Sequence, residues 1–299
     1  EDHSIPFVAL ELRFKGGGSL DLPGKRGATN LLVATLDEGA ADMDARDFAA
    51  ARAAIAAELR FDMGDDTVSV AAKFLTETKD EAMALLRAAL IEPNFDEAAV
   101  ERVRQQVLSN IRSDAKDPDE IVGDVFYADV FGDHPYGSAH SGTVDSVSGL
   151  TRDDLIAAHQ GALAKDRVYI AAAGDISAED LGALLDELLG ALPETGLPQP
   201  ADVDVVTEAG VQVVPYDTPQ SVALFGHKGL ERDHPDFFTA YVLNQILGGG
   251  GFEARLMEEV REKRGLTYGV YSYLVPRDLA NVYMGSVASS NDRIAEAIE

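Results

Sequence analysis

The sequence predicts an α+β fold made of a tandem repeat of two homologous units, each a mostly antiparallel sheet packed against helices, with the second unit truncated. Three observations lead to this prediction. Segments with the period-two alternation of strands are interspersed with segments of helical periodicity. Similar segments recur 212 to 214 residues apart. A chain of 299 residues also exceeds the usual size of a single core, so two domains are expected.

The expected first unit, residues 1–192, opens with a strand at 7–14, where apolar and polar residues alternate before a glycine turn. Residues 28–36 are mostly apolar, which is typical of a buried helix. An alanine-rich helix at 47–59 follows. A second alternating strand is expected at 68–75.

Helices dominate the rest of this unit. After a helix at 80–90, Pro93 and the candidate cap Asp96 open a long helix that runs to about Arg112. Asp117 and Pro118 break it. The remaining expected elements are a helix at 121–131, a loop HPYGSAH at 134–140, a helix at 151–163 capped by Thr151, a strand at 167–173 and a helix at 177–192.

A linker is expected at 193–210, where proline, glycine and acidic residues dominate and helical periodicity is lost. The second unit, 211–299, then begins with strands at 211–216 and 221–227. A helix follows at 235–247, with a proline at its start.

The internal repeat organises the whole chain. The segment near the start, FVALELRFKGG, is similar in sequence to SVALFGHKGL at 221–230. The helix expected around Asn30 is likewise similar to the segment around Asn244. The segment 68–86 is echoed at the C-terminal end. By this repeat, about 105 residues of the first unit have no counterpart after Glu299. We therefore expect a truncated or processed chain, with a genuinely short second domain as the alternative.

The most distinctive stretch is LGGGGFEARLMEEVREKRGLTY at 247–268. Four consecutive glycines, Gly248 to Gly251, predict a helix terminator and hinge, because each costs about 1 kcal/mol in a helix interior. A short helix with apolar residues at helical spacing is expected next, ending at Gly265 in a left-handed C-cap. Residues 266–271 alternate as a strand.

Arg261 and Tyr268 are the candidate functional pair of this stretch. Arg261 is expected in the last turn of the helix and Tyr268 near the start of the strand. A planar cation and a phenol, seven residues apart across a tight corner, could converge on one peptide carbonyl or carboxylate. The alternative is structural: the helix macrodipole alone favours an arginine in a last turn, and tyrosine is common in strands.

Composition excludes several classes of partner and of metal site. A net charge of −27 argues against nucleic acid or an anionic membrane as partner, and permits a cationic or neutral peptide. No apolar run approaches the ~20 residues of a membrane span. The absence of cysteine excludes thiolate zinc sites and disulfides. No two histidines stand at i, i+4, and His134 and His140 in the HPYGSAH loop are expected to be a turn feature rather than metal ligands.

A tandem α+β repeat with HPYG in the first unit and REKRGLTY in the second resembles the pitrilysin/insulysin family of metallopeptidases. In that family an active half carries His-x-x-Glu-His on its first buried helix and a further glutamate on a later helix. Here Asn30 and Ala34 stand in the histidine places and Val33 in the glutamate place, with Asn110 near the third ligand's place. The resemblance therefore implies that this chain holds no metal, and that zinc is bound by a partner subunit.

The same resemblance implies a role for the second unit. The half without zinc supplies an arginine and a tyrosine, here Arg261 and Tyr268, to the peptide held on the zinc half. Tyr268 would donate a hydrogen bond to the tetrahedral intermediate, and Arg261 would hold the substrate main chain. Gly248, Gly249, Gly250 and Gly251 would line the peptide channel.

We thus expect a non-catalytic subunit of a heterodimeric zinc metalloendopeptidase. Its partners would be a zinc-bearing homologous subunit and a peptide, with a mild preference for basic or neutral peptides and neither nucleic acid nor membrane. One alternative is a structural or assembly protein of the same fold without a role in proteolysis. Another is a peptide-binding module without a catalytic partner. The periplasm is the expected compartment, and the cytoplasm is the alternative.

Overall fold

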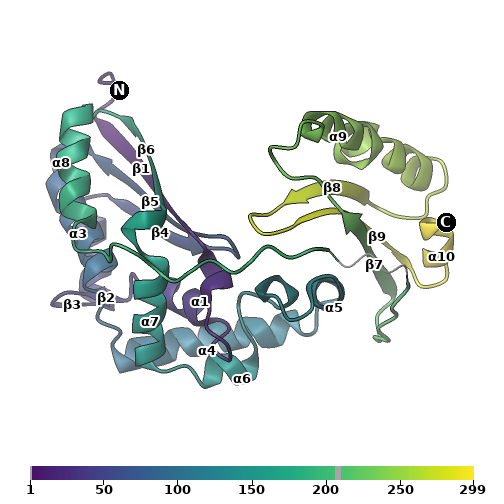
Figure 1. Cartoon of the computed structure of the whole chain (residues 1–299), viewed down its shortest axis with the longest axis horizontal. Helices are drawn as coiled ribbons and strands as arrows, with labels where there is room; N and C mark the ends of the chain where they lie inside the picture. Colours follow the sequence, from purple (N-terminus) through teal and green to yellow (C-terminus); the bar gives the residue numbers. More distant parts are fainter. Residues whose placement is uncertain (1, 206–209) are drawn as a thin grey trace. The chain divides into compact units, whose positions relative to one another are not determined.

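The computed structural model describes residues 2–205 and 210–299, which form two compact units (Figure 1). The first contains Glu1–Arg112 and Ala139–Pro200, and the second contains Ser113–Ser138 and Ala201–Glu299. The sequence assigned 113–138 to the first unit, whereas this segment belongs to the second compact unit. Residues 206–209 of the expected linker lie outside the described residues.

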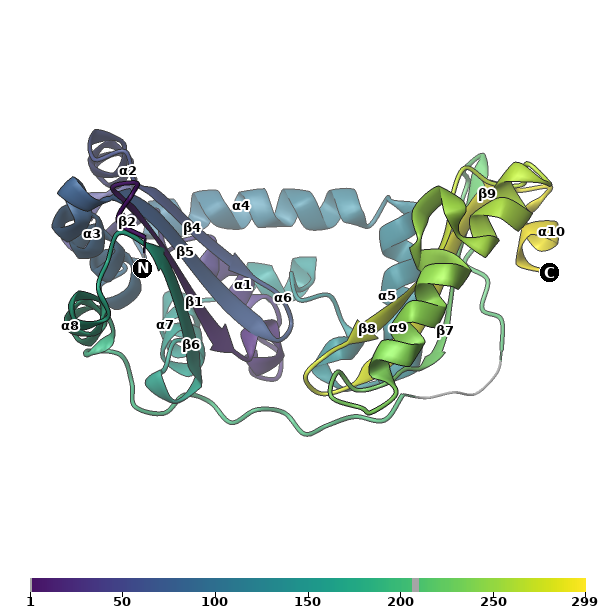
Figure 2. The same ribbon diagram turned by 90° about the horizontal axis from the view of Figure 1, so that it is seen from above.

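The first unit is built on a four-stranded antiparallel sheet in the order β4-β5-β1-β6. Side chains along β1 alternate between buried and more exposed positions, as the period-two pattern predicts. Figure 2 shows the strands running side by side. The strands are β1 (Phe7–Lys15), β4 (Glu58–Met63), β5 (Thr67–Leu75) and β6 (Val168–Gly174), and β2 (Gly39–Ala40) pairs separately with β3 (Met43–Asp44).

Helices bury the apolar face of this sheet. Leu10, Leu12 and Phe14 of β1 lie in one cluster with Leu86 of α3 and Leu188 of α8, and these two helices lie together on the sheet (Figures 1 and 2). The helices of this unit are α1 (Ala28–Val33), α2 (Ala45–Ala54), α3 (Lys79–Ile91), α4 (Glu97–Asp114), α6 (Val144–Ser148), α7 (Arg152–Ala162) and α8 (Ala178–Leu189).

The second unit is built on a three-stranded antiparallel sheet in the order β7-β9-β8. Its elements are α5 (Pro118–Phe131), β7 (Gln220–Lys228), α9 (Phe237–Asn244), β8 (Val270–Pro276), β9 (Asn281–Ser290) and α10 (Ile294–Ile298).

The strand pairing confirms the tandem repeat. β1 pairs with β5 from Phe7↔Leu75 to Lys15↔Thr67. β7 pairs with β9 from Gln220↔Ser290 to Lys228↔Val282, which is the same antiparallel pairing over nine residues. The hairpin partners β4 and β8 occupy equivalent outer positions. The second sheet has no counterpart of β6 among the residues that the structure describes.

Helices α5 and α9 cover opposite faces of the second sheet. The Tyr127 hydroxyl of α5 lies 3.6 Å from the sulfur of Met284, whereas Asn244 of α9 bonds the hydroxyl of Tyr283. Because successive residues of a strand point to opposite faces, these neighbouring contacts place the two helices on either side. The segment 113–138 thus supplies one of the two layers around this sheet.

Two strand predictions were wrong. Residues 211–216 form no strand, and the side chains of Val211 and Val213 are exposed, because no neighbouring strand pairs with this segment in the described part of the chain. The strand expected at 266–271 begins only at Val270. Periodicity alone cannot supply the pairing partner that a strand needs.

Candidate functional site

The glycine run follows α9 directly. The helix continues past Asn244 through a π-helical turn, Gln245–Gly249, so Gly248 and Gly249 remain helical. Gly251 turns the chain with a φ of +66°, in open space, and starts a 3₁₀ turn, Gly251–Glu253. The predicted hinge is therefore shorter than the four-glycine run, because the bend lies at its last residue.

Gly248 is required by the close approach of this helix to β8. A Cβ at Gly248 would lie 2.4 Å from Ser272 Oγ and 2.6 Å from Ser272 N. The contact is reinforced by a buried polar network, in which Ser272 Oγ donates to Asn244 Oδ1 at 2.8 Å and the Tyr283 hydroxyl donates to the same oxygen at 3.0 Å. Asn244 and Ser272 are both buried, and their hydrogen bond satisfies Asn244 Oδ1 and the Ser272 hydroxyl.

A second short helical segment carries Arg261. It includes a π-helical turn, Met257–Glu262, and ends at Gly265. Gly265 has a φ of +59°, and its N–H donates to Arg261 O, while Leu266 N–H donates to Val260 O. The left-handed C-cap predicted at Gly265 is confirmed, and its two bonds satisfy carbonyls at the helix end.

Tyr268 is presented to solvent by an anchored loop. Thr267 Oγ1 donates to Ala288 O at 2.6 Å, and Ser289 Oγ donates to Leu266 O, so Leu266 and Thr267 are tied to β9. Between these tethers and β8, the side chain of Tyr268 is 86% exposed. The loop therefore holds the Tyr268 backbone in place while the phenol is directed outward.

Arg261 is held by an aromatic ring. Its guanidinium carbon lies 4.5 Å from the centre of the Phe252 ring, and Nη1 lies 3.5 Å from Glu262 Oε1. Nη1 is buried but makes no hydrogen bond in the described structure. The Arg261 side chain as a whole is 30% exposed, so its other N–H groups can be reached by a ligand.

The nearby cations are more fully neutralised than Arg261. Lys263 Nζ lies 2.6 Å from Glu259 and 3.0 Å from Glu258, and Arg264 lies 3.1 Å from Glu259. The hydrogen bond to Glu259 raises the pKa of Lys263, and the same bond lowers the pKa of Glu259. Arg261 is therefore less fully neutralised than Lys263 and Arg264, its neighbours at the end of this segment.

The structure does not join the two residues of the candidate pair. In the part of the chain that the structure describes, no hydrogen bond, ion pair or ring contact links Arg261 to Tyr268. Both belong to the second unit, and their convergence on one peptide group stays a prediction.

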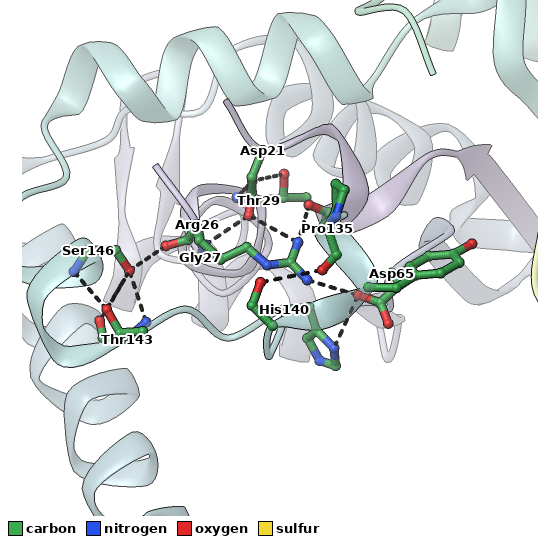
Figure 3. A network of polar contacts seen from close by, with 12 residues as sticks. Asp21, Arg26, Gly27, Thr29, Asp65, Pro135, His140, Thr143 and Ser146 are labelled. Carbon is green, nitrogen blue, oxygen red and sulfur yellow. Dashed lines mark hydrogen bonds and ion pairs between the residues drawn. The ribbon is translucent and has the colours of Figure 1, made fainter. Parts of the chain in front are cut away.

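The helix that aligns with the zinc-motif helix is α1, and its start is fixed by a buried acid (Figure 3). The carboxylate of Asp21 accepts hydrogen bonds from Gly27 N at 2.8 Å, Thr29 N at 2.8 Å and Thr29 Oγ1 at 2.7 Å. Burial raises the pKa of Asp21, against the lowering effect of these bonds. Arg26 donates to Asp65 at 3.1 Å and connects the same loop to the β4–β5 turn.

The residues at the motif positions do not fit a metal. Val33 is buried and apolar, Ala34 ends the helix, and the Asn110 side chain is exposed and accepts a bond from Gln106. Across residues 2–205 and 210–299, no group of three His, Cys, Asp or Glu side chains is placed to hold a metal ion. The described helices also include none long and apolar enough to cross a membrane.

Sequence reasoning missed the role of the HPYG loop. The buried Tyr136 hydroxyl accepts a hydrogen bond from Leu279 N at 3.1 Å. The Arg277 guanidinium carbon lies 4.7 Å from the ring centres of both Tyr136 and Tyr127. This loop and α5 therefore clamp the β8–β9 hairpin within the second unit, which no local pattern in the sequence indicates.

These features define the class: a tandem-repeat α+β protein of metallopeptidase type whose motif helix lacks metal-binding side chains. Residues 1–144 match the family model for insulinase, peptidase family M16, and residues 149–299 match the model for the peptidase M16 inactive domain. The chain belongs to peptidase family M16, and its C-terminal half matches the family's inactive domain.

Similar proteins are named in different ways. The chain is 29% identical to a Helicobacter pylori protein named non-peptidase homolog YmxG, over 91% of this chain and 63% of that protein. It is 30% identical to an uncharacterized zinc protease of Mycobacterium leprae, over 83% of this chain and 56% of that protein. The chain thus spans less than two thirds of the length of these curated relatives.

Solved structures share the fold. A peptidase M16 inactive domain from Pseudomonas fluorescens superposes with a TM-score of 0.89 at 28% identity, covering 99% of this chain and 72% of that one. A chain of complex III2 from Candida albicans has a TM-score of 0.77 at 15% identity, covering 98% of this chain and 69% of that one. The second likeness shows the fold alone.

Proposed function

We propose that this protein is the non-catalytic subunit of a heterodimeric zinc metalloendopeptidase, and that it contributes Arg261 and Tyr268 to a peptide held by a zinc-bearing homologous subunit. The observation that carries the proposal is the state of these two side chains. Tyr268 is 86% exposed on an anchored loop, and the Arg261 side chain, 30% exposed, makes no hydrogen bond within the described residues. The match to the family's inactive domain supports the same assignment.

The residue types suit transition-state stabilisation. The Tyr268 hydroxyl would donate a hydrogen bond to the oxygen that becomes negative when the peptide carbonyl is attacked. Arg261, held by its ring contact with Phe252, would donate two parallel hydrogen bonds to the peptide main chain. The metal and the attacking water would belong to the partner, because the α1 residues of this chain do not fit a metal.

The glycine run would contribute to peptide binding through its backbone. Gly248 and Gly249 line a cavity of about 580 Å³ in the second unit. Gly249, Gly250 and Gly251 are exposed and carry no side chain that would block an approaching main chain.

The test is reconstitution. Purified chain and a zinc-bearing M16 subunit should hydrolyse peptides together and not separately. Tyr268→Phe should reduce kcat about a hundredfold, the usual cost of one oxyanion donor, while co-elution of the two subunits is unchanged. Full turnover by the Tyr268→Phe heterodimer would remove Tyr268 from the mechanism.

The second candidate is a structural or assembly role. It is favoured by the shared fold with a chain of complex III2 and by the name of the Helicobacter pylori relative. Under this alternative, deletion of the gene would disturb a complex, and the Arg261→Ala, Tyr268→Phe double variant would restore that complex fully. Failure of this variant to restore function would favour the peptidase subunit.

A further inference from the structure

The helix that precedes the proposed site presents an exposed apolar surface. The run from Phe237 to Phe252 contains sixteen residues without a charge, in a chain in which 26% of residues are charged. Its large exposed side chains include Phe238 at 70%, Leu243 at 63% and Phe252 at 69%.

A cavity of about 580 Å³ lies between this helix and β8, within the second unit. Its aromatic lining includes Tyr241 and Tyr271, both partly exposed. The buried pair Asn244 and Ser272 also lines it, with Ser272 donating to Asn244. Apolar walls with a few fixed polar groups are typical of a ligand pocket.

Arg232 is the one charged residue that lines this cavity in the described structure. Its guanidinium carbon lies 4.6 Å from the ring centre of Phe237 and 5.6 Å from that of Phe238. The described residues give its side chain no ion pair and no hydrogen bond. Stacking holds the face of the guanidinium, while its N–H groups, which lie in the plane, remain able to bind a carboxylate.

We propose that this cavity binds an extended peptide by a large apolar side chain, with a carboxylate next to that side chain paired to Arg232. The proposal rests on the proposed peptide-handling role and specifies the class of peptide. The carboxylate comes from an acidic side chain or from the peptide C-terminus, since Arg232 would recognise either one.

This specificity differs from the preference for basic or neutral peptides that the net charge suggests. Charges farther away than about 8 Å are largely screened at physiological ionic strength, so contacts inside the cavity outweigh the overall charge. None of the described residues that line the cavity is acidic. Arg232 also borders a second cavity, which Glu231 and Asp233 line, but it forms no ion pair with either residue in the described chain.

The absence of tryptophan from the chain provides a direct assay. Blocked hexapeptides containing Trp-Glu, Trp-Gln or Trp-Lys would be titrated with the protein, and binding would be followed by the fluorescence of the peptide tryptophan. We expect Trp-Glu to bind about three- to fivefold more tightly than Trp-Gln, as for a partly exposed ion pair, and Trp-Lys to bind most weakly. A peptide ending in tryptophan with a free carboxylate distinguishes a terminal from a side-chain acid.

The variants are Arg232→Gln and its matched control Arg255→Gln. Arg255 is also exposed and in the second unit, but it does not line the cavity. Arg232→Gln should abolish the preference for Trp-Glu, Arg232→Lys should retain part of it, and Arg255→Gln should leave it unchanged. Competing peptides with alanine in place of the apolar residue should bind about tenfold more weakly, because that side chain is no longer buried.

The inference would be overturned by no binding of any probe, or by equal binding of Trp-Glu and Trp-Lys. A Trp-Glu preference that survives Arg232→Gln would also overturn it. These outcomes are separable from the proposed function, because reconstituted hydrolysis and its dependence on Tyr268 are measured with the partner subunit. If reconstitution succeeds and the cavity binds nothing, only the cavity assignment fails.

Discussion

Gly248 offers the sharpest test of how the site is built. In Gly248→Ala, the new Cβ would lie 2.4 Å from Ser272 Oγ, 2.6 Å from Ser272 N and 2.8 Å from Leu256 Cδ1. These distances are well below ordinary contact, and the backbone nitrogen cannot rotate away. Overpacking of this kind costs about 1–3 kcal/mol, whereas alanine in a helix gains up to about 1 kcal/mol over glycine. We expect a net loss of about 1–2 kcal/mol in the free energy of unfolding.

The matched control is Gly182→Ala. Gly182 lies in α8, and a Cβ there would meet nothing within 4 Å. This variant should gain about 0.5–1 kcal/mol, because only the backbone entropy of the unfolded chain changes. Urea unfolding followed by circular dichroism would give both values. A Gly248→Ala protein as stable as the wild type, beside a stabilised Gly182→Ala protein, would refute the close approach between this helix and β8.

Three further predictions follow from buried contacts. Burial lowers the pKa of His159, whose neutral Nε2–H donates a hydrogen bond to Leu90 O. Below about pH 6.5 the unfolded chain therefore binds a proton at this histidine more readily than the folded chain does. Unfolding free energy should therefore fall as the pH drops from about 7 to about 5, and His159→Gln should show a smaller fall in urea titrations. Tyr136→Phe leaves the Leu279 N–H without its acceptor and should cost about 1–2 kcal/mol by the same measurement, with an unchanged value arguing against the clamp. Arg277→Gln removes the stacked guanidinium and should lower the thermal midpoint, an effect that should shrink when Tyr136 is already phenylalanine.

Much of the fold could be predicted from the sequence, because local pattern and repetition agree. The alternation at 7–14 and 68–75 gave two strands of the first sheet, and the repeat gave their counterparts in the second. The strand expected at 211–216 failed because its pairing partner is a non-local property. β4 was not predicted, because the helical periodicity of the alanine-rich segment at 47–59 extends into the first residues of β4.

The candidate site could be predicted only in part. Gly265 carries a conformational signal that sequence reasoning identifies, and its left-handed φ is confirmed. Arg232 gave no such signal, because its environment is created by stacking on a helix and by a cavity wall from β8. The uncharged run after it was the available clue, since a sixteen-residue stretch without charge is unusual on an exposed helix.

The position of α5 has a consequence for biosynthesis. This helix covers one face of the second sheet, yet it leaves the ribosome about ninety residues before β7, the first strand of that sheet. The apolar side of α5 therefore stays exposed until the intervening chain has been synthesised. Contacts between segments that are far apart in the sequence form slowly. The nascent protein therefore passes through a partly folded state whose exposed apolar surface chaperones can bind.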